Sequence, residues 1–252
     1  MFKKANFYYF SPTGGTKKAG NILAQAIAEE INFIDLGAKT PINESPCDIS
    51  IIALPVFAGR IPSFTCEKVK SLNGADKKIV TMVVYGVRAY DDALLELNDA
   101  AKEAGFQVIA SAAVVAQHSM AAFVGAGRPD EKDDAEIKDF ALNILKKANE
   151  ATTSAINVPG NKPYRDIAQF PVSPVCTDEC KGCGLCIKTC PVDAITKNDG
   201  KISTDIEKCI LCLACTSVCQ KGARVLPKPF SDGIAAKMAP LKEIARANEF
   251  YL

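Results

Sequence analysis

Two runs of closely spaced cysteines constrain this chain more than any other feature of its sequence. The first run contains Cys180, Cys183, Cys186 and Cys190, and the second contains Cys209, Cys212, Cys215 and Cys219. Both follow the pattern Cys-x2-Cys-x2-Cys-x3-Cys. We find no secretory leader and no apolar run long enough to cross a membrane, so a cytoplasmic location with reduced thiols is expected. Clustered cysteines in that environment indicate metal ligands rather than disulfides.

The spacing within each run favours iron–sulfur chemistry. Three thiolates on one tight loop can bind three irons of a cubane, and the fourth cysteine of each run then ligates the other cluster. The sequence therefore predicts two [4Fe-4S] clusters. The first would be held by Cys180, Cys183, Cys186 and Cys219, and the second by Cys209, Cys212, Cys215 and Cys190. Structural zinc, the alternative, prefers two separated pairs of cysteines and fits this even spacing less well.

The two runs form an internal repeat, and their loops differ in one respect. Gly182 and Gly184 relieve crowding where the first loop passes its cluster, whereas the second loop has leucine at the corresponding positions. Cys176 stands outside both runs, and we expect it to be a free thiol near the first cluster. The remaining two cysteines, Cys47 and Cys66, are expected to be small buried hydrophobic residues.

Charge and composition narrow the classes of function. The formal net charge is +1, so no strong field exists to hold nucleic acid or an anionic membrane. His118 is the single histidine, which argues against a histidine-dependent triad or a histidine-rich metal site. The hydrophobic fraction of 48% is that of an ordinary globular protein.

The first part of the chain alternates strand-like and helix-like patterns, which is typical of a parallel α/β sheet. Strands are predicted at residues 6–10, 32–36, 49–57, 78–85 and 106–116. Helices are predicted at residues 16–30, 91–104 and 130–149, with a short one from Pro62. Five strands with crossover helices indicate a doubly wound parallel sheet.

Changes in composition along the sequence predict four segments. Residues 1–155 form the α/β domain, and residues 156–175 form a proline-rich linker. Residues 176–230 form a small α+β domain around the cysteines. Residues 231–252 are expected to form a C-terminal helix that docks on one of the domains, because apolar residues recur at helical spacing between Ile234 and Phe250.

The loop after the first strand is suited to bind a phosphate. It consists of Ser11, Pro12, Thr13, Gly14, Gly15 and Thr16. A strand-to-helix turn directs backbone N–H groups and the positive end of the helix dipole at one point. The hydroxyl groups add further donors, and the glycine pair permits a close approach. A capped helix start without a ligand is the alternative.

Two more loops follow at the carboxyl ends of the third and fourth strands, where doubly wound sheets bind ligands. The candidate residues are Pro55, Val56, Phe57, Ala58, Gly59, Tyr85, Gly86, Val87, Arg88 and Tyr90. Phe57 and Tyr90 are expected either to stack on a flat ring or to pack at the strand ends. Arg88 would face such a ring or the solvent. His118 follows the fifth strand at the same edge.

The loop at residues 11–16 resembles the FMN phosphate loop of flavodoxins, and the cysteine runs resemble those of bacterial two-cluster ferredoxins. Together they resemble the ferredoxin–flavodoxin fusion proteins of anaerobes, also called 4Fe-4S flavoproteins. The resemblance implies a flavodoxin-like domain that binds FMN, followed by a ferredoxin-like domain with two [4Fe-4S] clusters. Two positions depart from the pattern: Val87 stands where related domains often have asparagine, and Gln220 stands where the first run has Pro191.

Three functions are compatible with this reading. The first is an electron-transfer flavoprotein that links a one-electron, low-potential carrier to a partner protein. The second is a flavin-dependent reductase of a small substrate, such as a quinone or an unsaturated compound, and the third is a redox sensor. The chain has no Gly-x-Gly-x-x-Gly strand–helix unit for a dinucleotide, so electrons are expected to come from a ferredoxin-like donor or pass to an acceptor enzyme. The sequence leaves open a homodimer and the identity of the redox partner.

Overall fold

The computed structural model describes residues 1–148, 155–167 and 170–252, and its largest element is a six-stranded sheet. The strands are β1 (Phe2–Tyr9), β2 (Ala28–Asp35), β3 (Ile49–Pro55), β4 (Lys78–Tyr85), β5 (Gln107–Val115) and β10 (Glu249–Tyr251). Their order is β10-β5-β4-β3-β1-β2, with only β10 antiparallel to its neighbour. Without β10 this is the flavodoxin-like order 2-1-3-4-5, so the predicted fold class is confirmed.

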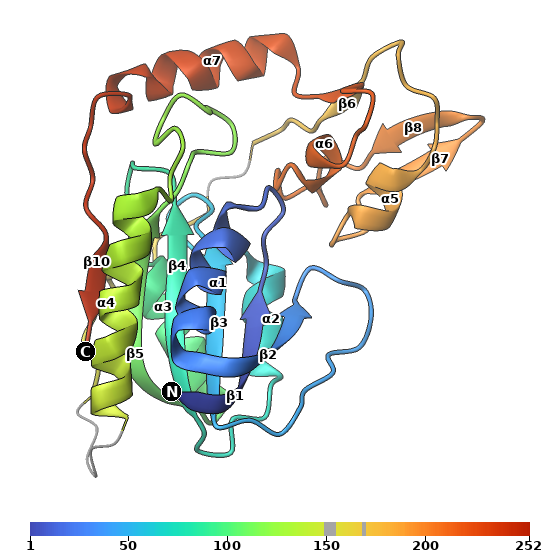
Figure 1. Cartoon of the computed structure of the whole chain (residues 1–252). Helices are drawn as coiled ribbons and strands as arrows, with labels where there is room; N and C mark the ends of the chain where they lie inside the picture. The colour runs from blue at the N-terminus through green and yellow to red at the C-terminus, as the bar shows by residue number, and fades with distance from the viewer. Residues whose placement is uncertain (149–154, 168–169) are drawn as a thin grey trace.

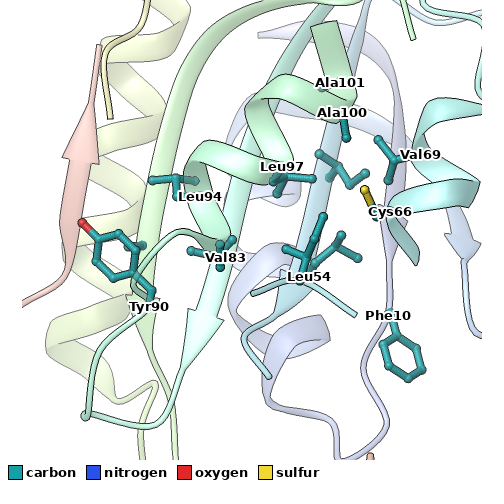
Figure 2. Close-up of a cluster of buried hydrophobic side chains, with 14 of the residues drawn as sticks. Phe10, Leu54, Cys66, Val69, Val83, Tyr90, Leu94, Leu97, Ala100 and Ala101 are labelled. Carbon is teal, nitrogen blue, oxygen red and sulfur yellow. The ribbon is translucent and has the colours of Figure 1, made fainter. Parts of the chain in front are cut away.

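Helices cover both faces of this sheet (Figure 1). On one face lie α1 (Gly15–Ile27) and α4 (Glu131–Lys147), and on the other lie α2 (Ser63–Lys70) and α3 (Ala93–Glu103). The central strands β3, β4 and β5 are buried along nearly their whole length and are mostly apolar, as expected for strands covered on both faces. The polar residues among the buried ones are Ser50, Thr81 and Ser111. Figure 2 shows the hydrophobic cluster on the α2–α3 face, in which Leu54 and Val83 meet Val69 and Leu97.

The C-terminal segment differs from the predicted helix over residues 234–250. The helix α7 runs from Lys228 to Met238 and is followed by a 3-10 turn, η1 (Ala239–Leu241). Pro240 cannot donate a backbone hydrogen bond and does not continue the α-helix. The last strand, β10, then pairs with β5. Its side chains alternate, because Phe250 packs on the α1–α4 face of the sheet and Tyr251 packs on the other.

The cysteine-rich part contains short elements only. These are β6 (Val175–Cys176), α5 (Leu185–Thr189), β7 (Ile195–Asn198), β8 (Lys201–Thr204), α6 (Ala214–Ser217) and β9 (Arg224–Val225). β6 pairs with β9, and β7 pairs with β8, both antiparallel. A small core of Cys190, Ala194, Ile195 and Cys215 lies inside. In Figure 1 this part lies beyond the carboxyl ends of the parallel strands.

Direct contacts hold the cysteine-rich part against the sheet domain. Ile210 and Cys212, from the second cysteine loop, pack against the hydrophobic cluster of Figure 2. Ile234 of α7 packs against the same cluster. Lys39, in the loop after β2, forms an ion pair with Asp193. These contacts place the second cysteine loop beside the domain that precedes it.

Within the predicted linker, residues 156–167 follow the surface of the sheet domain without a helix or strand. The backbone N–H groups of Asn161 and Arg165 each donate to the carboxylate of Asp92, at 2.8 Å. Arg60 donates to the carbonyl oxygen of Arg165 at 2.7 Å. The predicted helix end at Asn149 lies outside the described residues. None of the helices in the described ranges is both long and apolar enough to cross a membrane.

Candidate functional site

The cysteines of the two runs line two hollows. The first hollow is lined by Cys180, Cys183, Cys186 and Cys219, which we name the first thiol set, and also by Cys176 and Arg224. The second hollow is lined by Cys190, Cys209, Cys212 and Cys215, the second thiol set. Each hollow thus combines three cysteines of one run with the fourth of the other run. Among the described residues, no three His, Cys, Asp or Glu side chains converge closely enough to hold a single metal ion.

Both cysteine loops have the same backbone conformation. Gly182 and Gly184 have φ values of 61° and 81°. The corresponding leucines of the second loop, Leu211 and Leu213, have φ values of 52° and 65°. Positive φ in residues other than glycine is uncommon and carries strain, so the second loop holds this shape against local preference. Such turns point successive N–H groups inward and create concavities suited to anions, including iron–sulfur clusters.

Local contacts change the acidity of the thiols. The backbone N–H of Gly182 donates to the Cys180 sulfur and lowers the pKa of that thiol. Burial raises the pKa of Cys212 to about 12. A metal that binds there must displace the proton, since a cysteine ligates as the thiolate.

Arg224 is a buried cation between the two hollows, and the cysteine spacing gave no indication of it. Its exposed fraction is 4%. Nη1 donates to the sulfur of Cys176 at 3.4 Å, and Nη2 donates to the hydroxyl of Thr204. Burial lowers the pKa of its guanidinium, but the nearby thiols of Cys176 and of Cys215, in the second thiol set, raise it above the usual value. Its Nε has no hydrogen-bond partner in the described part of the chain.

The loop of residues 11–16 joins β1 to α1 at the carboxyl edge of the sheet. Ser11 accepts a hydrogen bond from the backbone N–H of Lys17 at 2.8 Å, which fixes the turn. Gly14 has a φ of 93°, and no described atom lies within 4 Å of where its Cβ would be. The N–H groups of Gly15 and Thr16 belong to the first helical turn, which has no intrahelical acceptors for them. No acidic residue occupies that turn. These features fit a phosphate.

The two glycines at the other edge loops have a packing role. A Cβ on Gly59 would lie 2.2 Å from Asp91, and a Cβ on Gly86 would lie 2.5 Å from the His118 ring. The space beside these glycines is therefore filled by protein side chains. Both loops remain at the carboxyl edge, and the backbone N–H of Val56, in the first of them, donates to the carbonyl oxygen of Val84.

The two aromatic candidates have different surroundings. Tyr90 is 7% exposed, and its hydroxyl donates to Glu249 at 2.6 Å. The surroundings of Tyr90 match the second predicted alternative, packing at the strand end, because its ring lies in the core (Figure 2). Phe57 is half-buried and packs edge-on against Phe10, with ring centroids 6.3 Å apart. Phe57 stays at the loop surface.

The remaining edge residues are held by the C-terminal segment and by one another. Arg246 donates to the carbonyl oxygens of Val87 and Arg88 at 3.2 and 3.1 Å. Arg88 forms an ion pair with Asp91, and Val87 is buried. Sequence reasoning missed Arg246, because a single arginine far along the chain carries no spacing signal. His118 is half-buried, and desolvation lowers the pKa of its ring.

Comparisons with known proteins find different relatives for the two parts of the chain. Residues 179–223 match the family model described as 4Fe-4S dicluster domain, which covers less than half of the chain. No curated protein is significantly similar to the chain in sequence.

The solved structures that resemble this protein match its sheet domain. One is a short-chain flavodoxin associated with a bacterial microcompartment, with 16% identity, a TM-score of 0.43, and coverage of 58% of this chain and 99% of that one. Another is the FMN-bound flavodoxin of Fusobacterium nucleatum, with 11% identity, a TM-score of 0.42, and coverage of 58% and 99%. A third is rubredoxin:oxygen oxidoreductase from Desulfovibrio gigas, with 16% identity, a TM-score of 0.43, and coverage of 58% and 37%.

The fold assignment rests on the strand order rather than on these weak similarities. The cysteine spacing, the two thiol-lined hollows and the family match agree on one chemical class. The chain therefore joins a flavodoxin-like α/β domain to a ferredoxin-like iron–sulfur domain of the 4Fe-4S type.

Proposed function

We propose that this protein is an iron–sulfur flavoprotein that transfers electrons between two [4Fe-4S] clusters and FMN. It would link a one-electron, low-potential carrier protein to a redox partner, as in the ferredoxin–flavodoxin fusion proteins of anaerobes that it resembles. The observation that carries the proposal is that two hollows, each lined by at least four cysteines, lie in a part of the chain beyond the carboxyl ends of the parallel strands. When bound, each cluster supplies one-electron chemistry and FMN supplies one- or two-electron chemistry.

The thiol sets fit clusters by their donor chemistry. Each set offers four sulfur ligands from two separate chain segments, the number that a cubane requires. Positive-φ turns like those at Gly184 and Leu213 can direct successive N–H groups toward a bound cluster. The first set would hold one cluster and the second set the other.

The edge loops fit FMN mainly through backbone groups. The first turn of α1 and the hydroxyls of Ser11, Thr13 and Thr16 would hold the phosphate. The loops at residues 55–59 and 85–88 would contact the ring through their backbone, with Phe57 as the aromatic side chain at the surface. Arg88 and Val87 stay in place because Arg246 binds their carbonyl oxygens.

The second thiol set lies on the side toward the flavodoxin-like domain. Ile210 and Cys212 pack on the hydrophobic cluster that also includes Phe10, at the start of the phosphate loop, and Val87, in the second edge loop. This packing holds the second cysteine loop against the flavodoxin-like domain. The chain itself thereby keeps one cluster site close to the proposed flavin site.

Anaerobic purification followed by iron, sulfide, zinc and flavin analysis tests the proposal. About eight irons, eight sulfides and one FMN per chain are expected. Zinc in place of iron would overturn the cluster sites, and eight irons without flavin would overturn the flavin site alone. Mixing with a reduced ferredoxin in a stopped-flow instrument should then reduce the flavin rapidly, and a failure there would overturn the electron-transfer function.

A pair of variants tests the phosphate loop specifically. Gly15→Asp places a carboxylate in the first turn of α1, where it favours the helix but repels a phosphate. We expect at least a tenfold loss of FMN affinity with unchanged iron content. Gln25→Asp adds the same charge at an exposed position late in α1 and should leave FMN binding unchanged. Equal FMN binding by both variants would contradict this phosphate site.

A further inference from the structure

The first hollow contains one more thiol than a cubane needs. Five cysteines line it: Cys176, Cys180, Cys183, Cys186 and Cys219. Among the described residues that line the second hollow, there are four cysteines and no fifth. The two repeats therefore differ by one sulfur, although their loops share the same backbone shape.

Local structure brings the fifth thiol beside one particular ligand. Cys176 lies in β6, and the turn of Thr177 to Cys180 returns the chain, with the Cys180 N–H donating to the Thr177 carbonyl oxygen at 3.1 Å. Cys176 and Cys180 both line the first hollow. Cys176 thus lies beside Cys180, the first cysteine of the first run.

Arg224 provides an independent reason to regard this position as a ligand site. The register of β6 and β9 sets Cys176 opposite Arg224, whose Nη1 donates to the Cys176 sulfur at 3.4 Å. The guanidinium is more than nine-tenths buried, lines the hollow, and keeps its Nε without a described partner. A buried, incompletely paired cation favours an anionic group such as a thiolate–iron cluster beside it.

We infer that Cys176 is a reserve ligand of the first cluster and replaces Cys180 when the Cys180–iron bond breaks. In this exchange one iron–sulfur bond to Cys180 is lost and one to Cys176 forms. The proton of the Cys176 thiol passes to the released Cys180 sulfur, so no electron, oxidant or reductant is involved. The hydrogen bond from Arg224 holds the Cys176 sulfur at the wall of the hollow. This inference rests on the cluster sites of the proposed function.

Iron content and low-temperature electron paramagnetic resonance of the full chain, purified anaerobically, test the exchange. Cys180→Ser should keep about eight irons per chain with a perturbed spectrum, because Cys176 completes the site. The double variant Cys176→Ser/Cys180→Ser should fall to about four irons. The matched control is Cys209→Ser, the first cysteine of the other run, which should also fall to about four irons. Loss of four irons by Cys180→Ser alone would overturn the inference.

A second measurement avoids variants in the primary ligands. Wild type and Cys176→Ser should both carry about eight irons, and a chelator should release four of them several-fold faster from Cys176→Ser, because a broken Cys180 bond is no longer recaptured. Equal release rates would overturn the reserve role. A wild-type chain without iron would instead overturn the proposed function itself, so the two failures are distinguishable.

Discussion

The hydroxyl groups of Tyr90 and Tyr251 lie 2.8 Å apart, although 161 residues separate them in the chain. Both also bond the same carboxylate oxygen of Glu249, each at 2.6 Å. This group fastens the loop after β4 to the C-terminal strand. Burial, with the Glu249 contact, raises the pKa of Tyr251 to about 12, so the hydroxyl stays protonated and can donate.

Removal of one hydroxyl should therefore weaken the attachment of β10. We expect Tyr251→Phe to lower the free energy of unfolding by about 1.5–3 kcal/mol, the range for a hydrogen bond to a charged group. Thermal unfolding followed by circular dichroism measures the loss. Leu252→Ala, at an exposed neighbouring position, serves as the control. Equal stability of the two variants would show that the tyrosine pair does not fasten the strand.

Two ion pairs should differ sharply in their contribution to stability. Arg60 binds Glu96 through two hydrogen bonds of 2.7 Å, and both side chains are largely buried. Glu96→Gln should cost about 3 kcal/mol, because it leaves a buried guanidinium without its counter-charge. Lys39→Ala breaks the exposed pair with Asp193 and should cost at most about 1 kcal/mol. Urea unfolding of both variants makes the comparison, and a larger effect at Lys39 would contradict it.

His118 should make stability depend on pH near neutrality. Burial lowers the pKa of its ring, so the unfolded chain binds a proton more readily than the folded one. The stability contributed by the neutral ring is present above about pH 6.5 and is lost as the pH falls below that value. Because the chain has one histidine, its NMR signal can be titrated without overlap. The stability of His118→Gln should lose this dependence, and a ring that titrates above about pH 6.5 would refute the prediction.

Arg224 should raise the reduction potential of the adjacent cluster sites. Its buried positive charge favours the more negative, reduced state, so Arg224→Met should lower a cluster potential by about 60 mV or more, a tenfold change for a one-electron couple. Arg224→Lys keeps the charge and should restore most of the shift. Lys221→Met, at an exposed lysine that lines the same first hollow, should change the potential little, since water screens it. Redox titration followed by paramagnetic resonance provides the values, and an unchanged potential in Arg224→Met would exclude the effect.

The sequence predicted the parts of the fold that depend on local pattern. Continuous apolar runs located β3 and β4, and the cysteine spacing located the loops that line the hollows. The C-terminal strand was not predicted. The helical spacing after Ile234 gives no information about the pairing of residues 249–251 with β5. The choice between ring stacking and packing for Tyr90 stayed open for the same reason: its partners, Glu249 and Tyr251, lie in a segment whose position only the tertiary structure determines.

Because β10 pairs with β5, the last segment of the chain belongs to the same sheet as the first. The iron–sulfur domain is an insertion in the flavodoxin-like domain, tethered at both ends, rather than an appendage at one end. Proteolysis within residues 155–167 would cut one tether and leave the other in place through β10. During synthesis, the sheet can gain its sixth strand only after the whole cysteine-rich segment has been made.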